Sequence, residues 1–225
     1  MKRLFLHAKS PAEIVPSKED IKNLPQKVGI ATTVQHVHKL AELITALKKE
    51  GKTPLTKRAG HAFFEGQILG CSFEEITDAE GYLYVGDGMF HPQLILLKTE
   101  KPVYVFHPIS KKFFLLGNAE IEKIKKRQKG AYLKFLSSAT IGILVSTKPG
   151  QNNMKNALEL QNKIRTDGKQ AHIFIADTII LPELNNFPFI ECWVNTMCPR
   201  IAIDDYGKTE KPILNMEDIS ELYRF

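Results

Sequence analysis

The sequence predicts an α/β protein of two similar domains, each with a small, mainly parallel four-stranded sheet flanked by helices. Two observations lead to this prediction. Short apolar runs typical of strands alternate with helical periodicity almost throughout the 225 residues, which is the pattern of β-α-β units and a parallel sheet. The alternation also occurs twice, each time as strand, helix, strand, a loop rich in glycine or proline, and strand.

The first cycle begins with a buried strand over Lys27–Thr33. A helix over Val37–Glu50 follows, with apolar residues on one face, and it ends at Gly51 because glycine commonly terminates helices. The remaining elements of this cycle are expected to be a strand over Gly81–Val85, a helix over Pro92–Lys98, a strand over Pro102–Phe106 and a long basic helix over Asn118–Ser137.

The second cycle repeats the plan. The expected elements are a strand over Thr140–Ser146, a helix over Asn153–Thr166, strands over Ala171–Ala176, Phe189–Val194 and Pro212–Leu214, and a terminal helix over Met216–Tyr223. We place the domain boundary in the connecting helix, so that the two α/β units span 17–125 and 126–225.

Composition narrows the function classes. Lys and Arg outnumber Asp and Glu by 31 to 25, and this excess is typical of solvated helix surfaces. It would also suit docking on an acidic protein. A nucleic-acid-binding module is the alternative, but a stacking platform and an Arg-dense helix are missing, so we expect no direct nucleic-acid binding. No apolar run is long enough to span a membrane.

Three cysteines occur, at Cys71, Cys192 and Cys198. This odd, sparse set argues against a secreted disulfide framework and for a reducing compartment, so we expect a cytoplasmic protein. A zinc ribbon is excluded because there is no CxxC pair. Cys192 lies inside a predicted strand and is expected to be an inert core residue. Each of the other two remains open between a structural thiol and a metal ligand.

Ligands of open parallel sheets bind beyond the carboxyl ends of the strands. Four polar or glycine-rich segments are expected there and to face one cleft: Thr33–His38, Gly86–Pro92, Ser146–Gln151 and Asn195–Arg200. His36, His38 and His91 begin predicted helices, where they serve either as capping or core residues or as part of an anion site. The turn after Ser146 lacks the spacing of a P-loop.

Five ordered segments are more specific than any single residue. Taken together they resemble the diphthamide synthase family, the 2-(3-amino-3-carboxypropyl)histidine synthases, over essentially the whole chain. The segments are TTVQHVH (Thr32–His38), GQILGC (Gly66–Cys71), YVGDGMFHP (Tyr84–Pro92), VSTKPGQ (Val145–Gln151) and VNTMCPRIAIDD (Val194–Asp205).

The resemblance implies three similar α/β domains, each giving one cysteine to a shared [4Fe–4S] cluster. Cys71 matches the ligand of the second domain and Cys198 that of the third, whereas Cys192 matches no ligand. The first-domain cysteine has no counterpart, and residues 1–16 resemble the last strand of that domain. We therefore expect one part of a split enzyme, with the third thiolate supplied by a first-domain polypeptide or a homodimer partner.

The resemblance also implies the reaction. It is the first step of diphthamide biosynthesis, in which radical cleavage of S-adenosylmethionine provides a 3-amino-3-carboxypropyl group for a histidine of translation elongation factor 2. The open iron binds the methionine part. The alternative is a non-catalytic partner subunit of the same complex. Residues expected to contact S-adenosylmethionine are Gln35, His36, Gly86, Gly88, His91, Lys148, Gln151 and Arg200.

Overall fold

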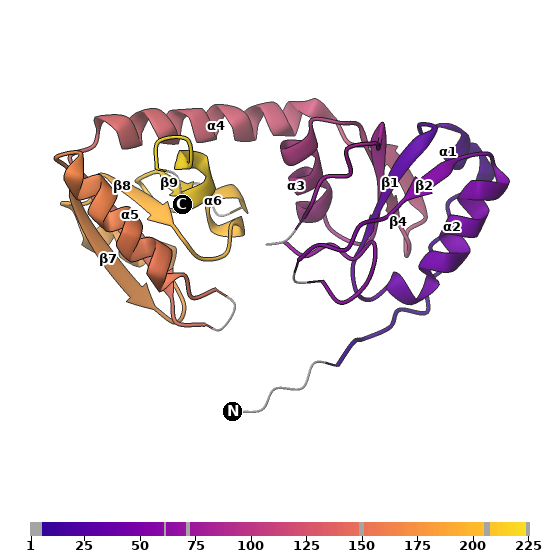
Figure 1. Cartoon of the computed structure of the whole chain (residues 1–225), viewed down its shortest axis with the longest axis horizontal. Helices are drawn as coiled ribbons and strands as arrows, with labels where there is room; N and C mark the ends of the chain where they lie inside the picture. Colours follow the sequence, from indigo (N-terminus) through magenta and orange to yellow (C-terminus); the bar gives the residue numbers. More distant parts are fainter. Residues whose placement is uncertain (1–5, 61, 71–72, 149–150, 205–207, 224–225) are drawn as a thin grey trace. The chain divides into compact units, whose positions relative to one another are not determined.

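A computed structural model describes residues 6–60, 62–70, 73–148, 151–204 and 208–223 (Figure 1). The chain divides into two compact units, Met1–Ile121 and Glu122–Phe225, which we call unit 1 and unit 2. The division lies within helix α4 (Asn118–Ser137), the same helix in which the sequence placed the domain boundary. Among the described residues, no helix has the length and apolar character needed to cross a membrane.

Unit 1 contains a five-stranded sheet in the order β2-β1-β3-β4-β5. The first four strands in this order are parallel and the last pair is antiparallel. The strands are β1 (Lys27–Thr32), β2 (Thr53–Leu55), β3 (Gly81–Val85), β4 (Val103–His107) and β5 (Lys112–Leu115). The fold class is confirmed, although this sheet has one strand more than the four expected.

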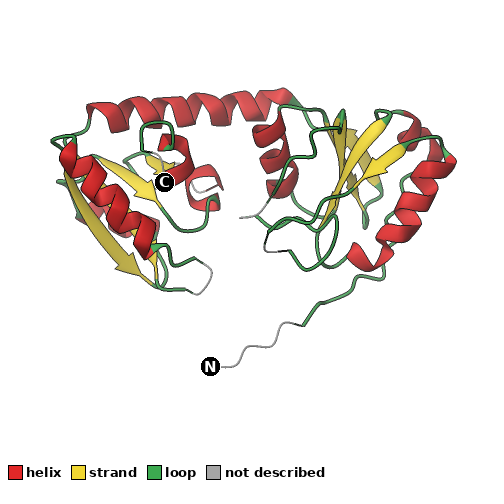
Figure 2. Cartoon of the chain, in the orientation of Figure 1, coloured by secondary structure: helices red, strands yellow, loops and turns green. Residues whose placement is uncertain are grey.

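Helices flank this sheet (Figure 2). They are α1 (Lys18–Lys22), the 3-10 helix η1 (Val37–Lys39), α2 (Leu40–Lys49) and α3 (Phe90–Thr99). Buried side chains of α1 and α2, including Ile21, Leu43 and Leu47, form one core with strand residues such as Ile30 and Leu83. Helix α3 contacts β3 and β4. Burial of apolar side chains on the sheet stabilises this unit.

The N-terminal segment differs from the expected strand. The described part, residues 6–16, has no regular secondary structure, so the strand proposed over 1–16 is absent there; residues 1–5 lie outside the described chain. The segment is nevertheless tied to unit 1. Ile14 is buried in its core, and the Ser10 amide donates a hydrogen bond to the Gln35 carbonyl at 2.9 Å. A single such bond does not make a sheet ladder.

Unit 2 contains a fully parallel four-stranded sheet in the order β7-β6-β8-β9, as the sequence predicts. Its strands are β6 (Thr140–Ser146), β7 (Gln170–Ala176), β8 (Cys192–Asn195) and β9 (Ile213–Asn215), and its other elements are α5 (Met154–Thr166), η2 (Leu181–Asn186), α6 (Arg200–Asp204) and η3 (Met216–Ile219). The expected terminal helix over Met216–Tyr223 is wrong. A capping box of Asn215 and Asp218 begins only a 3-10 turn there.

Two apolar clusters cover the two faces of the second sheet. One joins α4 and α5 to alternate strand residues through side chains such as Phe135, Leu160 and Ile143. The other surrounds Trp193 with residues of η2 and neighbouring loops, Leu184 among them. Because successive strand residues point to opposite faces, both sets of strand side chains are buried.

The two units share details as well as plan. In unit 1, Gly29 of β1 is in register with Tyr82 of β3, and a Cβ built on this glycine would lie 2.5 Å from the tyrosine ring. In unit 2, Gly142 of β6 is in register with Trp193 of β8, and its Cβ would lie 2.3 Å from the indole. In both sheets, therefore, only glycine makes room for the large ring on the neighbouring strand.

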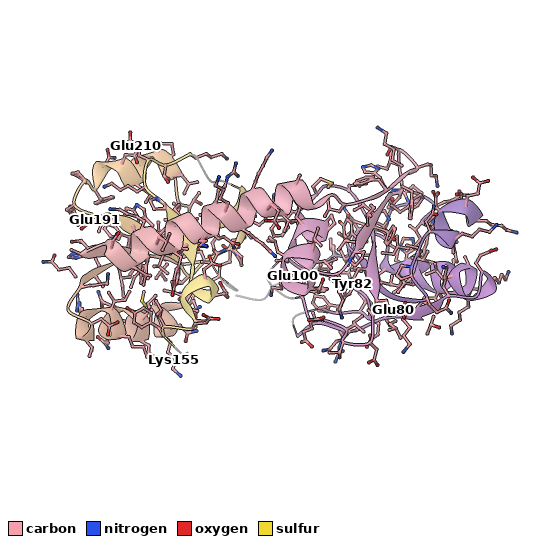
Figure 3. The ribbon with its side chains drawn as sticks, turned by 90° about the horizontal axis from the view of Figure 1, so that it is seen from above. Glu80, Tyr82, Glu100, Lys155, Glu191 and Glu210 are labelled. Carbon is pink, nitrogen blue, oxygen red and sulfur yellow. The ribbon has the colours of Figure 1, made fainter. Side chains whose placement is uncertain are left out.

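A glutamate precedes each ring-bearing strand. Glu80 accepts hydrogen bonds from two amides at the start of β1, at 3.1 and 3.2 Å, and Glu191 accepts two from amides at the start of β6, at 3.1 and 3.3 Å. Figure 3 labels Glu80, Tyr82 and Glu191. Positions 80 and 82 of unit 1 thus correspond to positions 191 and 193 of unit 2.

Candidate functional site

The carboxyl ends of three neighbouring strands of unit 1 lie side by side. Thr32 at the end of β1 is in register with Val85 of β3, and Val85 is in register with Phe106 of β4. The segments that follow these strands, Thr33–His36 and Gly86–Met89, therefore share one edge of the sheet with His107. This edge is where a ligand of a parallel sheet is expected.

The loop Gly86–Met89 is held in place by two side-chain hydrogen bonds, one to the residue before it and one within it. The Thr32 hydroxyl donates to the Val85 carbonyl at 2.7 Å, and the Tyr84 hydroxyl donates to the Asp87 carbonyl at 3.2 Å. A Cβ on Gly86 would lie 2.6 Å from that hydroxyl oxygen. Gly88 has a φ of +77°, a conformation that favours glycine. Both glycines are therefore required by the loop's shape.

The carboxylate of Asp87 contacts the imidazole of His107. The Asp87 Oδ1 lies 3.2 Å from His107 Nε2, while His107 Nδ1 accepts a hydrogen bond from the Ser110 amide at 3.2 Å. Because Nδ1 accepts, the imidazole proton is on Nε2 and points to the carboxylate. The Asp87 side chain remains 44% exposed, so it can also meet a ligand.

His36 is buried without a partner. It is 1% exposed, and neither ring nitrogen has a hydrogen bond among the described residues. Burial lowers the pKa of His36, and the carboxylate of Asp87 opposes this shift. An unsatisfied buried polar group costs roughly 1–3 kcal/mol. An unpaired imidazole at the sheet edge where ligands are expected indicates that its hydrogen-bond partner belongs to the ligand.

His91 and Tyr84 complete this edge. Their rings stack with centroids 5.8 Å apart, and the Tyr84 hydroxyl lies 3.4 Å from His91 Nδ1. Burial raises the pKa of Tyr84, so the hydroxyl keeps its proton at neutral pH. Gln35 is exposed next to His36, and its Oε1 accepts a hydrogen bond from Thr33 at 2.9 Å.

Cys71 lies outside the described residues, but the chain that leads to it passes this edge. The Thr32 amide donates to the Gly66 carbonyl and the Ile68 amide to the Thr32 carbonyl, both at 2.8 Å. A Cβ on Gly70 would lie 2.6 Å from the ring of Phe90, at the start of α3. The described part of the GQILGC segment, residues 66–70, therefore runs alongside the end of β1.

Cys198 follows β8 of unit 2 as a free, partly exposed thiol. The buried Asn195 side chain donates to the Cys198 carbonyl at 2.9 Å and to Asn215 Oδ1 at 2.8 Å. It also accepts from the Met197 amide at 3.1 Å. One amide side chain thus fixes the loop that presents the thiol. An accessible cysteine on a fixed loop is suited to bind an iron–sulfur cluster through its sulfur.

Lys148, Gln151 and Arg200 belong to the same edge of unit 2. The Lys148 ammonium donates to Thr178 Oγ1 at 3.0 Å, and the Gln151 amide donates to the Lys148 carbonyl at 3.0 Å. Arg200 is exposed at the first position of α6. The eight residues expected to contact S-adenosylmethionine thus form two groups, five at the edge of unit 1 and three at the edge of unit 2.

Cys192 is a core residue, which confirms the prediction. It is fully buried, its sulfur lies 3.6 Å from the Pro212 carbonyl, and burial raises the pKa of its thiol to about 12. These surroundings are those of a structural cysteine, whereas reactive cysteines are partly exposed. Within the described residues, no group of three or more His, Cys, Asp and Glu side chains could hold a metal ion.

Sequence reasoning missed three residues of these edges. Asp87 could have been recognised from the sequence, because it lies between two glycines directly after a predicted strand. Asn195 was included in the segment Asn195–Arg200 without a role of its own, and His107 gave no signal, because their roles depend on strand register and on hydrogen bonds to residues distant in sequence.

Comparison with known proteins gives a consistent result. The model of the diphthamide synthesis protein family matches residues 1–222. A 2-(3-amino-3-carboxypropyl)histidine synthase of Pyrococcus horikoshii is 30% identical over 205 residues, which cover 90% of this chain and 59% of the relative. The synthase of Methanocaldococcus jannaschii is also 30% identical, over 88% of this chain and 54% of the relative.

A solved structure agrees with these relatives. The crystal structure of Dph2 from Pyrococcus horikoshii with a 4Fe–4S cluster superposes with a TM-score of 0.80 at 28% identity, over 91% of this chain and 59% of that one. The chain thus spans little more than half the length of these archaeal proteins. From the family model and the two synthases, it belongs to the diphthamide synthesis protein family.

Proposed function

We propose that this chain takes part in the first step of diphthamide biosynthesis. The reaction transfers the 3-amino-3-carboxypropyl group of S-adenosylmethionine to a histidine of translation elongation factor 2 by radical chemistry. The observation that supports this proposal most directly is the family match over residues 1–222, which includes both cysteine segments. A relative with the same fold was crystallised with a 4Fe–4S cluster.

Cys71 and Cys198 are the proposed cluster ligands. Cys198 fits the role because it is accessible and its loop is fixed by Asn195. Cys192 does not fit, because it is fully buried among the strands of unit 2 and burial raises the pKa of its thiol. The third thiolate would come from outside these 225 residues, on a first-domain polypeptide or a second copy of the chain. When bound, the cluster supplies the electron that breaks the bond between the sulfur and the γ-carbon of S-adenosylmethionine.

The chain's own residues hold and orient S-adenosylmethionine. In unit 1 this task falls to the fixed loop of Gly86 and Gly88 and to Gln35, His36 and His91. In unit 2, Lys148, Gln151 and Arg200 provide a donor-rich edge next to Cys198. Positive side chains suit the carboxylate and the electron-rich parts of the cosubstrate. Fixing one C–S bond near the cluster decides which bond breaks.

The test is a transfer assay under strictly anaerobic conditions. The chain is reconstituted with iron and sulfide and incubated with dithionite, elongation factor 2 and S-adenosylmethionine labelled in its carboxyl group. A first-domain polypeptide of the Pyrococcus horikoshii relative is present or absent. We expect label on the target histidine, located by peptide mass spectrometry, only when the first domain is present. Absence of label in both reactions would contradict the proposed enzyme function.

A second candidate is a non-catalytic subunit of the same complex. Several relatives are named as subunit 1 of the synthase, including one from Caenorhabditis elegans that is 27% identical over 84% of this chain, so synthases of more than one subunit occur in the family. The same assay separates the two roles. A Cys198→Ala chain that still supports full transfer would favour the non-catalytic role.

A further inference from the structure

Helix α4, labelled in Figure 1, carries most of the chain's excess positive charge. Its 20 residues include six Lys or Arg and two Glu, so it contributes +4 to a net charge of +6. In the rest of the chain the two signs nearly balance. The positive charge is therefore a local property of this helix, and a surface of one sign attracts partners of the other.

One side of α4 is buried in unit 2 and the opposite side is exposed. Ala131 and Phe135 belong to the apolar core of unit 2. Four exposed residues at spacings of three, four and three positions lie on the opposite face, and we call them the α4 row: Lys126, Lys129, Leu133 and Leu136. This spacing places all four on one stripe of a helix.

The first half of the α4 row is positive and unpaired. Neither Lys126 nor Lys129 has an ion pair or a side-chain hydrogen bond within the part of the chain that the structure describes. Together with neighbouring residues of α4 they line a hollow of about 460 Å³. The lining residues are Glu122, Lys123, Lys125, Lys126 and Lys129. Four ammonium groups against one carboxylate make this hollow complementary to an acidic side chain.

The second half of the α4 row is apolar. Leu133 is 56% exposed and Leu136 is 44% exposed, and residues three positions apart are neighbours on a helix surface. Nucleic-acid phosphates would use the lysines and leave the leucines uncovered. A second copy of α4 would bring like charges together. A protein helix with acidic and apolar residues at the same spacing matches both halves of the row.

We propose that the α4 row docks an acidic amphipathic helix of a partner protein. Its carboxylates contact Lys126 and Lys129, and its apolar side chains cover Leu133 and Leu136. This inference goes beyond the proposed function and does not depend on it, because the row contains no residue assigned to the cluster or to S-adenosylmethionine.

The test measures binding of two fluorescent synthetic helices to the full chain by anisotropy. Each peptide carries two glutamates and two leucines at the spacing of the α4 row, with the glutamates first in one peptide and the leucines first in the other, so that parallel and antiparallel docking are both sampled. We expect the wild-type chain to bind at least one of them. Lys126→Glu with Lys129→Glu should weaken this binding by roughly tenfold, and Leu133→Ser with Leu136→Ser by a similar factor.

The matched control is Lys48→Glu with Lys49→Glu. These exposed lysines lie in the last turn of α2, and their reversal changes the net charge by the same amount as reversal in the α4 row. The control should leave peptide binding within about twofold of the wild type. Circular dichroism verifies that each variant is folded, and glutamine replaces glutamate at both lysines of the row if the reversed chain is not.

Three results would overturn the inference. One is that the wild-type chain binds neither peptide. Another is an equal loss in the control, which would indicate attraction by net charge alone. The third is a loss in the lysine variant without a loss in the leucine variant, together with binding of a single-stranded oligonucleotide that the lysine variant also loses. That pattern would identify the helix as a surface for polyanions and not for an amphipathic helix.

Discussion

Trp193 packs directly against the backbone of Gly142 on the neighbouring strand. A Cβ built on this glycine would lie 2.3 Å from two carbons of the indole ring, and Trp193 is fully buried in its cluster. The ring cannot retreat without displacing the aromatic residues around it, such as Phe174 at a centroid distance of 4.8 Å. The sheet of unit 2 therefore depends on the absence of a side chain at position 142.

Gly142→Ala should consequently destabilise the protein. We expect the free energy of unfolding to fall by about 1–3 kcal/mol, the usual cost of overpacking a core. Gly130→Ala is the matched control, since a Cβ on this exposed glycine of α4 meets nothing within 4 Å; it should raise the free energy by about 0.5–1 kcal/mol. Urea denaturation measures both. A Gly142→Ala chain as stable as the wild type would disprove the close contact.

His36 should make the protein less stable in mild acid. Burial lowers its folded-state pKa below the ordinary 6.5, so the unfolded chain binds more protons in that range, and the free energy of unfolding falls as the pH drops below about 6.5. His36→Phe removes the titrating ring and its unpaired nitrogens. This variant should be at least as stable at neutral pH and should lose less stability on acidification.

Denaturation of both chains at about pH 7.5 and about pH 5.5 measures this difference. His172→Phe is a suitable control, because this partly buried histidine lies against Phe189 in unit 2. An acid-induced loss of the same size in the wild type and in His36→Phe would show that other groups cause it.

The strands were predictable where burial leaves an apolar run. Gly81–Val85 and Thr140–Ser146 were predicted with the bounds that the structure has, because a strand covered on both faces is apolar throughout. The strand Thr53–Leu55 was missed because it is short, lies at a sheet edge and contains a proline. Lys112–Leu115 was missed because three of its four residues are exposed.

The apolar spacing of Met216, Ile219 and Tyr223 imitates a helix, which explains the wrong terminal element. All three side chains are buried in the core of unit 2, but the chain reaches them through a 3-10 helix and turns. Periodicity reports which side chains are buried and does not fix the backbone between them.

The site could be predicted in outline. Histidines and glycines that follow strands were expected at the carboxyl edge, and His36, Gly86 and Gly88 lie there. The pairing of Asp87 with His107 could not be foreseen, since it joins residues from two different strand ends. Their meeting depends on the register of β3 against β4, which the sequence does not state.

The two described cysteines should differ sharply in reactivity. Cys192 is fully buried and its thiol pKa is raised to about 12, so it should resist iodoacetamide in the native protein at pH near 8. Cys198 is partly exposed and should be alkylated. Peptide mass spectrometry locates the label, and both should react in denaturant. Native labelling of Cys192 at the rate of Cys198 would contradict the buried assignment.

The most direct test of the account is the iron–sulfur content of the cysteine variants. Wild-type, Cys192→Ala and Cys198→Ala chains are reconstituted anaerobically, each with the first-domain polypeptide, and the bound cluster is measured by iron and sulfide analysis and by visible absorption. We expect Cys192→Ala to retain the cluster and Cys198→Ala to lose most of it, because Cys198 is the accessible one of these two cysteines and Cys192 is buried. Equal loss in the two variants, or a full cluster in Cys198→Ala, would contradict the assignment of Cys198 as a ligand.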